Sequence, residues 1–238
     1  MATARAHPDV LDVLAALGPF FAVEGHRPGA VPAQPWRALT EMTTPSVLRD
    51  RIGVVRSALS GRAGCAPEDV ELRVAASVTQ LGVAARLVAP VLAAQASGHR
   101  LGLRLDDSWW QDTVGGPVPL SVVDPAASAH RPGATALLDE VIAPITVATG
   151  ALAPVSPRVL WGNVASAVNG AAGQVARARP ELAPAAWDAA AAYFRHPALG
   201  AEHDPPGPSF RRSSCCLIYR LAPGQPGAVC GDCILGGR

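Results

Sequence analysis

The sequence contains no lysine, because all 20 of its basic residues are arginine, against 19 acidic residues. Without lysine the chain cannot form a Schiff base, attach pyridoxal phosphate or supply the lysine of a P-loop. Charged residues make up only 16% and hydrophobic residues 49%, which excludes an intrinsically disordered chain. The net charge of +1 gives no general attraction to nucleic acid or anionic lipid. We therefore expect no nucleic-acid partner.

An uninterrupted membrane-spanning run is also missing. The apolar stretch Val141–Ala176 contains a single charge, Arg158. Prolines and a glycine interrupt its first half, and side-chain amides that hydrocarbon would penalise interrupt its second half. We expect two buried helices here and no membrane span. We also expect a cytoplasmic protein, where thiols stay reduced.

Apolar residues at three- and four-residue steps predict most of the chain to be helical. Several expected helices start at a proline, which suits the first helical position because it needs no amide donor. The predicted helices cover residues 9–17, 46–59, 67 to about 89, 134–147, 157–178 and 184–194. Pro90 should kink the third helix or end it near Ala89.

One region has the two-residue period of a strand. Leu101, Leu103 and Leu105 alternate with Gly102 and Arg104. A Gly-Gly-Pro turn at 115–117 and a return strand at 119–123 would complete an antiparallel hairpin.

The fold class expected is therefore α+β and predominantly α-helical. A helical body over residues 1–208 would carry a small antiparallel β insertion near 100–123. A proline-rich linker, 200–208, leads to a short cysteine-rich segment, 209–238, which should fold back on the body.

Four of the five cysteines lie in the last 24 residues, and Cys65 stands apart. Cys215, Cys216, Cys230 and Cys233 have the spacing CC-x13-C-x2-C. Four thiolates can hold zinc, iron or a 2Fe–2S cluster. Adjacent cysteines are unusual for zinc, and a disulfide between neighbours would be strained, because their Cα atoms are only about 3.8 Å apart. Spacing alone favours an iron–sulfur centre and leaves zinc, disulfides and free thiols open.

The residues around these cysteines carry a family resemblance. The stretch 211–221, RRSSCCLIYRL, and the CGDC at 230–233 resemble the C-terminal signature of the FhuF family of ferric-siderophore reductases. The stretch 159–167, VLWGNVASA, is similar to a helix that precedes the cysteines in that family, and 72–77, LRVAAS, is a weaker likeness. The gap between the cysteine pairs is a few residues longer here, within turn-forming sequence at 222–228.

The resemblance implies a 2Fe–2S cluster held by the four tail cysteines and used to reduce Fe(III) in a ferric siderophore to Fe(II). No G-x-G-x-x-G motif follows a strand, so electrons would come from an external ferredoxin or flavoprotein. Arg211, Arg212 and Arg220 could favour the reduced cluster electrostatically. Asn163 could hydrogen-bond the tail, and Trp161 could contact substrate, although structural roles for both are favoured.

Two other functions remain possible. The cysteines could form a non-enzymatic zinc or iron–sulfur clamp or a redox sensor. A siderophore-synthesis or binding role has less support, because no ATP-binding motif is visible. Trp109 and Trp110 could contact a siderophore, but a structural pair is the favoured interpretation. The six histidines have no partner at metal-ligand spacing and receive no role.

Overall fold

A computed structural model describes residues 9–127, 133–200, 204–221 and 229–235 of the chain. Within these ranges helices predominate. The α-helices are α1 (Val10–Ala16), α2 (Pro45–Ala63), α3 (Leu72–Ala96), α4 (Ala134–Leu137), α5 (Ala143–Leu152), α6 (Pro157–Ala178), α7 (Ala183–Phe194) and α8 (Pro197–Gly200). The shorter helical turns are η1 (Leu39–Thr43), η2 (Pro67–Asp69), η3 (Leu138–Ile142), η4 (Pro180–Leu182) and η5 (Ile218–Leu221).

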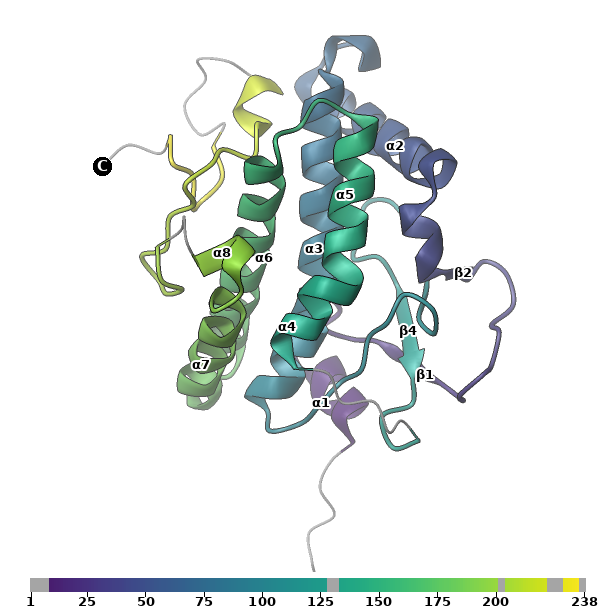
Figure 1. The fold of residues 1–238 in the computed structure, drawn as a ribbon, viewed down its shortest axis with the longest axis vertical. Coiled ribbons are helices and arrows are strands. Elements are labelled where there is room, and N and C mark those ends of the chain that lie inside the picture. Colours follow the sequence, from purple (N-terminus) through teal and green to yellow (C-terminus); the bar gives the residue numbers. More distant parts are fainter. Residues whose placement is uncertain (1–8, 128–132, 201–203, 222–228, 236–238) are drawn as a thin grey trace, which may run out of the picture.

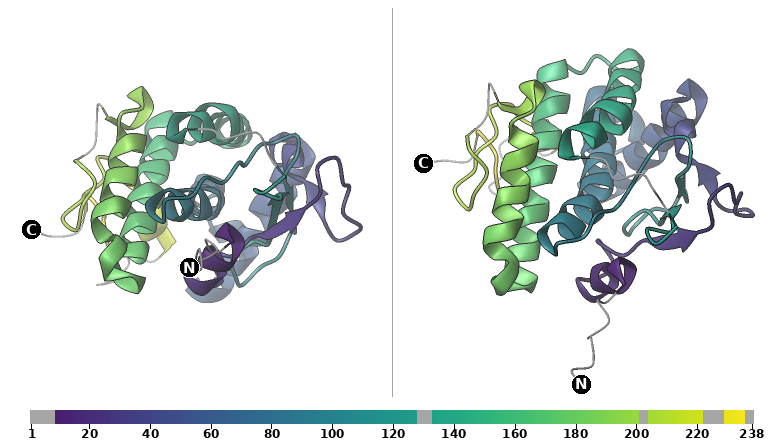
Figure 2. Two further views of the ribbon diagram at one scale, coloured as in Figure 1. Left: turned by 90° about the horizontal axis from the view of Figure 1, so that it is seen from below. Right: turned by 60° about the horizontal axis from the view of Figure 1, so that its bottom comes forward.

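Helix α3 is the centre of the fold, flanked by α6 and α7 on one side and by the small sheet and α2 on the other (Figures 1 and 2). It packs most extensively against α6. Its apolar residues are buried on nearly every side, from Val74 to Ala96. A helix that is apolar all round is one that the rest of the protein surrounds.

The sheet has four short strands in the order β1-β4-β3-β2. The strands are β1 (Glu24–His26), β2 (Arg37–Ala38), β3 (Trp109–Trp110) and β4 (Leu120–Val123). β3 pairs antiparallel with β4 and with β2, whereas β1 pairs parallel with β4. The predominantly helical α+β class is therefore confirmed, with a mixed sheet in place of the predicted antiparallel one.

The predicted hairpin has the wrong first strand. Leu101 and Leu103 are buried in the core as their alternation suggests, but their segment joins no ladder. Single hydrogen bonds satisfy the backbone instead, such as Thr40 N to Leu105 O at 3.1 Å. The return strand β4 pairs with β3, whose Trp110 is fully buried and donates its indole N–H to Ala38 O at 3.2 Å.

The predicted helices are present, with several different boundaries. α2 extends to Ala63, where Gly64 takes a left-handed conformation with φ of 67° and closes the helix. Pro67 begins the separate turn η2, and α3 starts only at Leu72. Pro90 does not end α3, because the helix continues to Ala96 and burial of the surrounding residues outweighs the cost of an interior proline.

Two helices pass a length and composition test for spanning a membrane, Leu72–Ala96 and Thr135–Leu152. Burial inside the protein covers 78% of the apolar window of the first and 39% of the second. The apolarity of α3 is therefore that of a helix buried in the core. The stretch 141–176 forms two helices, α5 and α6, as predicted.

The tail packs on a second, smaller hydrophobic cluster. This cluster is built by α2, the start of α3 and the start of α6, and includes Leu59, Val74 and Leu160. Leu217 and Ile218 from the tail lie against it. In Figure 1 the yellow tail runs beside α6. The cysteine segment is therefore held by the body along the part that the structure describes.

Candidate metal centre

Two of the four tail cysteines approach each other closely. Cys216 Sγ lies 3.6 Å from Cys230 Sγ. This pair joins one cysteine of the CC motif to one of the C-x2-C motif, and all four tail thiols are free. A disulfide would need about 2.05 Å, whereas two thiolates on one tetrahedral ion with bonds of about 2.3 Å are about 3.8 Å apart.

No three ligand side chains within the described ranges lie close enough together to hold one metal ion. Within the described residues the thiols thus form one close pair and no single tetrahedral group. Cys216 and Cys233 are buried, and Cys215 and Cys230 are partly exposed. The cluster assignment stays a prediction from the sequence.

The environment of the Cys216 thiol favours its ionised form. A hydrogen bond from Cys230 lowers the pKa of Cys216 to about 6, assisted by the Ile218 N–H and the charge of Arg212, against the opposing effect of burial. The same shared hydrogen bond and burial raise the pKa of Cys230. Burial is the largest cause that raises the pKa of Cys215 to about 11. A thiolate, which is the form that binds metal, is thus most accessible at Cys216.

Backbone N–H groups point at the sulfurs. Leu217 N donates to Cys215 Sγ, and Leu235 N donates to Cys233 Sγ, each at 3.3 Å. Leu217 adopts a positive φ of 71°, which is rare for a residue other than glycine. Arg212 N donates to Asp232 O at 3.1 Å and joins the two cysteine segments. These donors would stabilise negative charge on the sulfurs.

A buried polar network attaches the tail to the two central helices. Asn163 on α6 donates to Ser77 O at 3.0 Å and to Gln80 Oε1 at 3.0 Å on α3. Its own oxygen accepts from Arg212 Nη2 at 2.5 Å. Ser77 in turn donates to the carbonyl of Cys216 at 2.9 Å. Asn163 therefore hydrogen-bonds the tail, as one interpretation of the sequence proposed.

Gly162 explains why α6 and the tail can approach so closely. A Cβ at this position would lie 2.1 Å from Ser214 Oγ and 3.4 Å from Arg212 Nη2. Ser214 sits over the helix and donates to Arg158 O at 3.0 Å. The residue pair Gly162-Asn163 thus combines the space and the hydrogen-bond acceptor that the tail needs.

The three tail arginines occupy different environments. Arg212 is 1% exposed, and its Nε and Nη1 are buried with no hydrogen-bond partner among the described residues. Arg211 donates to Cys233 O at 3.2 Å. Arg220 pairs with Glu71 at the start of α3 and, as the largest cause, lowers the pKa of that carboxyl. Arg212 is the one that acts electrostatically on Cys216.

The three tryptophans singled out from the sequence belong to a ring pair and to the sheet. Trp161 stacks on His196 with ring centroids 5.7 Å apart, and His196 also contacts Asp139 at 3.0 Å. Trp109 and Trp110 form β3 of the sheet. None of the three is among the described residues that line the pocket beside the cysteines, and their proposed roles stay predictions.

Sequence reasoning missed several residues that hold the site together. Ser77 lies within the weakest stretch of resemblance, and Glu71 directly precedes it. Gly162 and Ser214 lie in stretches that resemble the family, but the sequence indicated no role for either residue. Their only signal was that each lies in a family-like stretch, because nothing in their spacing shows that α3, α6 and the tail meet.

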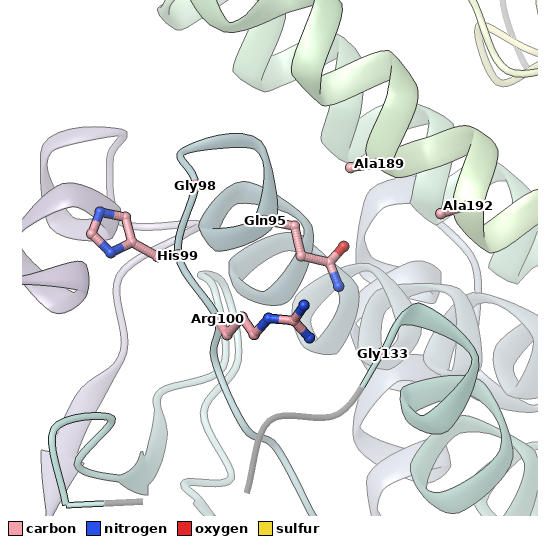
Figure 3. Close-up of a pocket in the computed structure, with 7 residues that line it drawn as sticks. All are labelled: Gln95, Gly98, His99, Arg100, Gly133, Ala189 and Ala192. Carbon is pink, nitrogen blue, oxygen red and sulfur yellow. The ribbon is translucent and has the colours of Figure 1, made fainter. Parts of the chain in front are cut away.

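Two pockets of the surface differ in chemistry. One of about 550 Å³ lies beside Cys216 and Cys230, and its other lining residues are mainly apolar. Another, of about 410 Å³, lies beside the C-terminal end of α3, near α7. In Figure 3, Gln95 and Arg100 point toward each other in this second pocket, and His99 points away from them. It has no cysteine among its lining residues.

No protein-family model matches the chain, and no curated protein is significantly similar to it. The functional conclusion therefore depends on the site and on the resemblance of its motifs.

Proposed function

We propose that this protein is a FhuF-like, 2Fe–2S ferric-siderophore reductase of the cytoplasm. One observation carries the proposal. The three separate stretches that resemble the family meet at the cysteines, through Ser77 in the first, Gly162 and Asn163 in the second, and Arg212 in the tail. A meeting of these stretches is expected if their shared purpose is to hold the cluster segment.

The donor set suits two irons better than one metal ion. Cys215, Cys216, Cys230 and Cys233 would hold the cluster, and Cys216 and Cys230 already lie 3.6 Å apart. The buried guanidinium of Arg212, two of whose nitrogens have no hydrogen-bond partner among the described residues, suits an anionic group nearby. When bound, a 2Fe–2S cluster supplies a one-electron carrier.

Arg212 would make reduction easier. Its charge is buried and acts on Cys216, and a cation near the centre favours the more negative, reduced form. Replacing Arg212 with glutamine should lower the reduction potential by an amount on the order of tens of millivolts. A redox titration followed by visible absorbance measures the shift. Arg212→Lys, which keeps the charge, should lie closer to wild type, and equal potentials in all three proteins would contradict the assigned role.

The chemistry at the substrate is a single electron transfer. Siderophores bind Fe(III) through hard oxygen donors, and Fe(II) is a softer ion that they hold less tightly. Fe(III) in the chelate gains one electron and an external ferredoxin or flavoprotein loses one. The weakened iron–oxygen bonds then break and Fe(II) leaves, while every covalent bond of the chelator stays intact. The protein's residues hold the electron carrier and exclude water from the buried sulfurs of Cys216 and Cys233.

A ferrous-trap assay tests the proposal. The protein purified without oxygen should be red-brown and bleach with dithionite. After excess dithionite is removed, it should release about one Fe(II) per reduced cluster from a ferric chelate. Failure to release Fe(II) from hydroxamate, catecholate and carboxylate chelates would overturn the enzyme function and leave a sensor. Complete reduction by NADPH alone would contradict the external donor.

Zinc is the second candidate, favoured by the four free thiols. A colourless protein with one zinc and no sulfide would support a structural clamp. The absence of any group of three ligand side chains within the described ranges argues against it.

A further inference from the structure

We propose that a pocket between α2, α3 and the loop that joins β3 to β4 binds a small organic monocarboxylate with an apolar body. Two buried arginines, Arg51 on α2 and Arg86 on α3, line this pocket, and we call it the arginine pocket. No tail cysteine is among its described lining residues. The inference therefore goes beyond the proposed function and does not depend on it.

The walls of the arginine pocket are mostly apolar. Its aliphatic and aromatic side chains come from α2, α3, the β3–β4 loop and the segment after α1, and they are Phe20, Val55, Val78, Val83, Pro117 and Val118. Its volume is about 260 Å³, slightly below the usual range of about 300–1,000 Å³ for small-molecule sites. The pocket therefore suits a ligand with a short body, and covering its walls with an apolar body is favourable.

Arg86 brings a buried charge to the pocket. It is 3% exposed, and its guanidinium donates to Val118 O at 2.6 Å, Phe20 O at 3.1 Å and Ala22 O at 2.5 Å. These bonds use three of its five N–H groups. Arg86 forms no ion pair with a carboxylate in the part of the chain that the structure describes.

The charge of Arg86 persists at neutral pH. Burial lowers the pKa of Arg86 to about 10, which is still well above 7. A buried charge that faces only carbonyl dipoles is costly. An anion in the pocket would reduce this cost and could accept the two remaining N–H groups.

Arg51 supplies further donors from α2. It is 7% exposed, pairs with Asp112 and donates from Nη1 to Thr113 O at 2.8 Å. Its Nε and Nη2 have no hydrogen-bond partner among the described residues. Because Asp112 balances the charge of Arg51, the two arginines leave one unbalanced positive charge. A ligand with a single negative charge matches it, and a carboxylate is the group that guanidinium donors bind best in pairs.

Gly82 leaves space for the ligand on α3. Val78, Gly82 and Arg86 follow one another at four-residue steps and lie on one face of the helix. Glycine weakens a helix interior relative to alanine, yet a Cβ at position 82 would meet no heavy atom within 4 Å. Packing inside the protein therefore does not require this glycine. The missing side chain instead keeps the pocket open beside Arg86.

The binding test is isothermal titration calorimetry on the full chain as purified. Benzoate and 3-methylbutanoate are small carboxylates with apolar bodies, benzamide is the neutral isostere of benzoate, and inorganic phosphate is an anion without an apolar body. We expect both carboxylates to bind saturably, and benzoate to bind at least about tenfold more tightly than benzamide. Phosphate should bind more weakly than benzoate, because it cannot cover the apolar walls.

Two glycine variants locate the ligand. Replacing Arg86 would also remove three hydrogen bonds to backbone carbonyls, so the variants change Gly82 instead. Gly82→Leu should fill the pocket and weaken benzoate binding at least about tenfold. Gly53→Leu is the matched control, because Gly53 is an exposed glycine inside α2 whose Cβ would also meet no heavy atom within 4 Å. Gly53 is not among the described lining residues, and its variant should bind benzoate as wild type does. Circular dichroism checks that both variants fold.

Four results would overturn the inference. No saturable binding of either carboxylate up to about 10 mM would exclude the site. Equal binding of benzoate and benzamide would show that the arginines do not recognise the ligand. Tighter binding of phosphate would exclude the organic class, and unchanged benzoate binding by Gly82→Leu would place the ligand elsewhere. None of these results bears on the iron–sulfur centre, which the ferrous-trap assay tests separately.

Discussion

Replacing Cys216 with serine should abolish the iron–sulfur centre. Cys216 is buried, and its hydrogen bond with Cys230, together with the charge of Arg212, lowers its pKa to about 6. A serine hydroxyl at this position would not ionise near neutral pH. Changes to residues that merely support a ligand cost about 10–100-fold in metal affinity. Loss of a ligand should cost more, and bound iron and sulfide should fall at least about tenfold.

Cys65→Ser is the matched control. Cys65 is also a free cysteine, but it is exposed beyond the end of α2 and outside the cysteine tail. Its replacement should leave iron, sulfide and the visible spectrum unchanged. Circular dichroism of both variants checks that the helices are retained. An unchanged spectrum in Cys216→Ser would show that this cysteine is not a ligand, and loss of stoichiometric zinc would replace the iron–sulfur proposal with the clamp.

The sequence predicted the helices well because their apolar periodicity and their prolines are local signals. It was wrong about the first strand because alternation reports alternating burial, which an extended segment without a ladder can share. Leu101 and Leu103 are buried in this way, and only tertiary contacts decide that β3 is the strand. The pairing of β1 with β4 joins residues about a hundred positions apart, so no local pattern could reveal it.

Pro90 shows that tertiary packing can also override a local signal that would break a helix. A proline inside a helix costs about 3 kcal/mol, and on local grounds Pro90 should kink α3 or end it near Ala89. The residues that follow, including Val91 and Leu92, are fully buried in the main core. Burying one such aliphatic side chain contributes about 1.5–3 kcal/mol, so a few of them outweigh the local cost.

The sequence predicted which cysteines make up the candidate site. It predicted less well which other residues hold those cysteines in place. Four cysteines in a short segment are obvious from the sequence alone. That Cys216 of the CC motif approaches Cys230 of the C-x2-C motif is visible only in the structure. The role of Asn163 was foreseen only as one possibility. Its partners, Ser77 and Gln80, lie more than eighty residues earlier and reach it only because α3 packs on α6.

Replacing Gly162 with alanine should destabilise the protein, although the same change elsewhere in α6 should stabilise it. Alanine in place of a glycine inside a helix gains about 0.8–1.0 kcal/mol. Here the new Cβ would lie 2.1 Å from Ser214 Oγ, and overpacking of this kind costs about 1–3 kcal/mol. The clash should therefore exceed the helical gain and displace the segment that leads into the cysteines. Thermal unfolding measures the stability, and iron analysis measures the effect on the centre.

Gly170→Ala is the control in the same helix, because a Cβ there meets no heavy atom within 4 Å. This variant should be more stable than wild type by up to about 1 kcal/mol. Ser214→Ala supplies a second test, since it removes the clashing oxygen and leaves the Ser214 Cβ position 3.5 Å from the new methyl group. It loses the bond to Arg158 O, which costs about 1 kcal/mol. Even so, the double variant Gly162→Ala/Ser214→Ala should be more stable than the sum of the single changes predicts, by about 1–3 kcal/mol. Simple additivity, or a Gly162→Ala variant as stable as Gly170→Ala, would mean that the tail does not rest on α6 at this glycine.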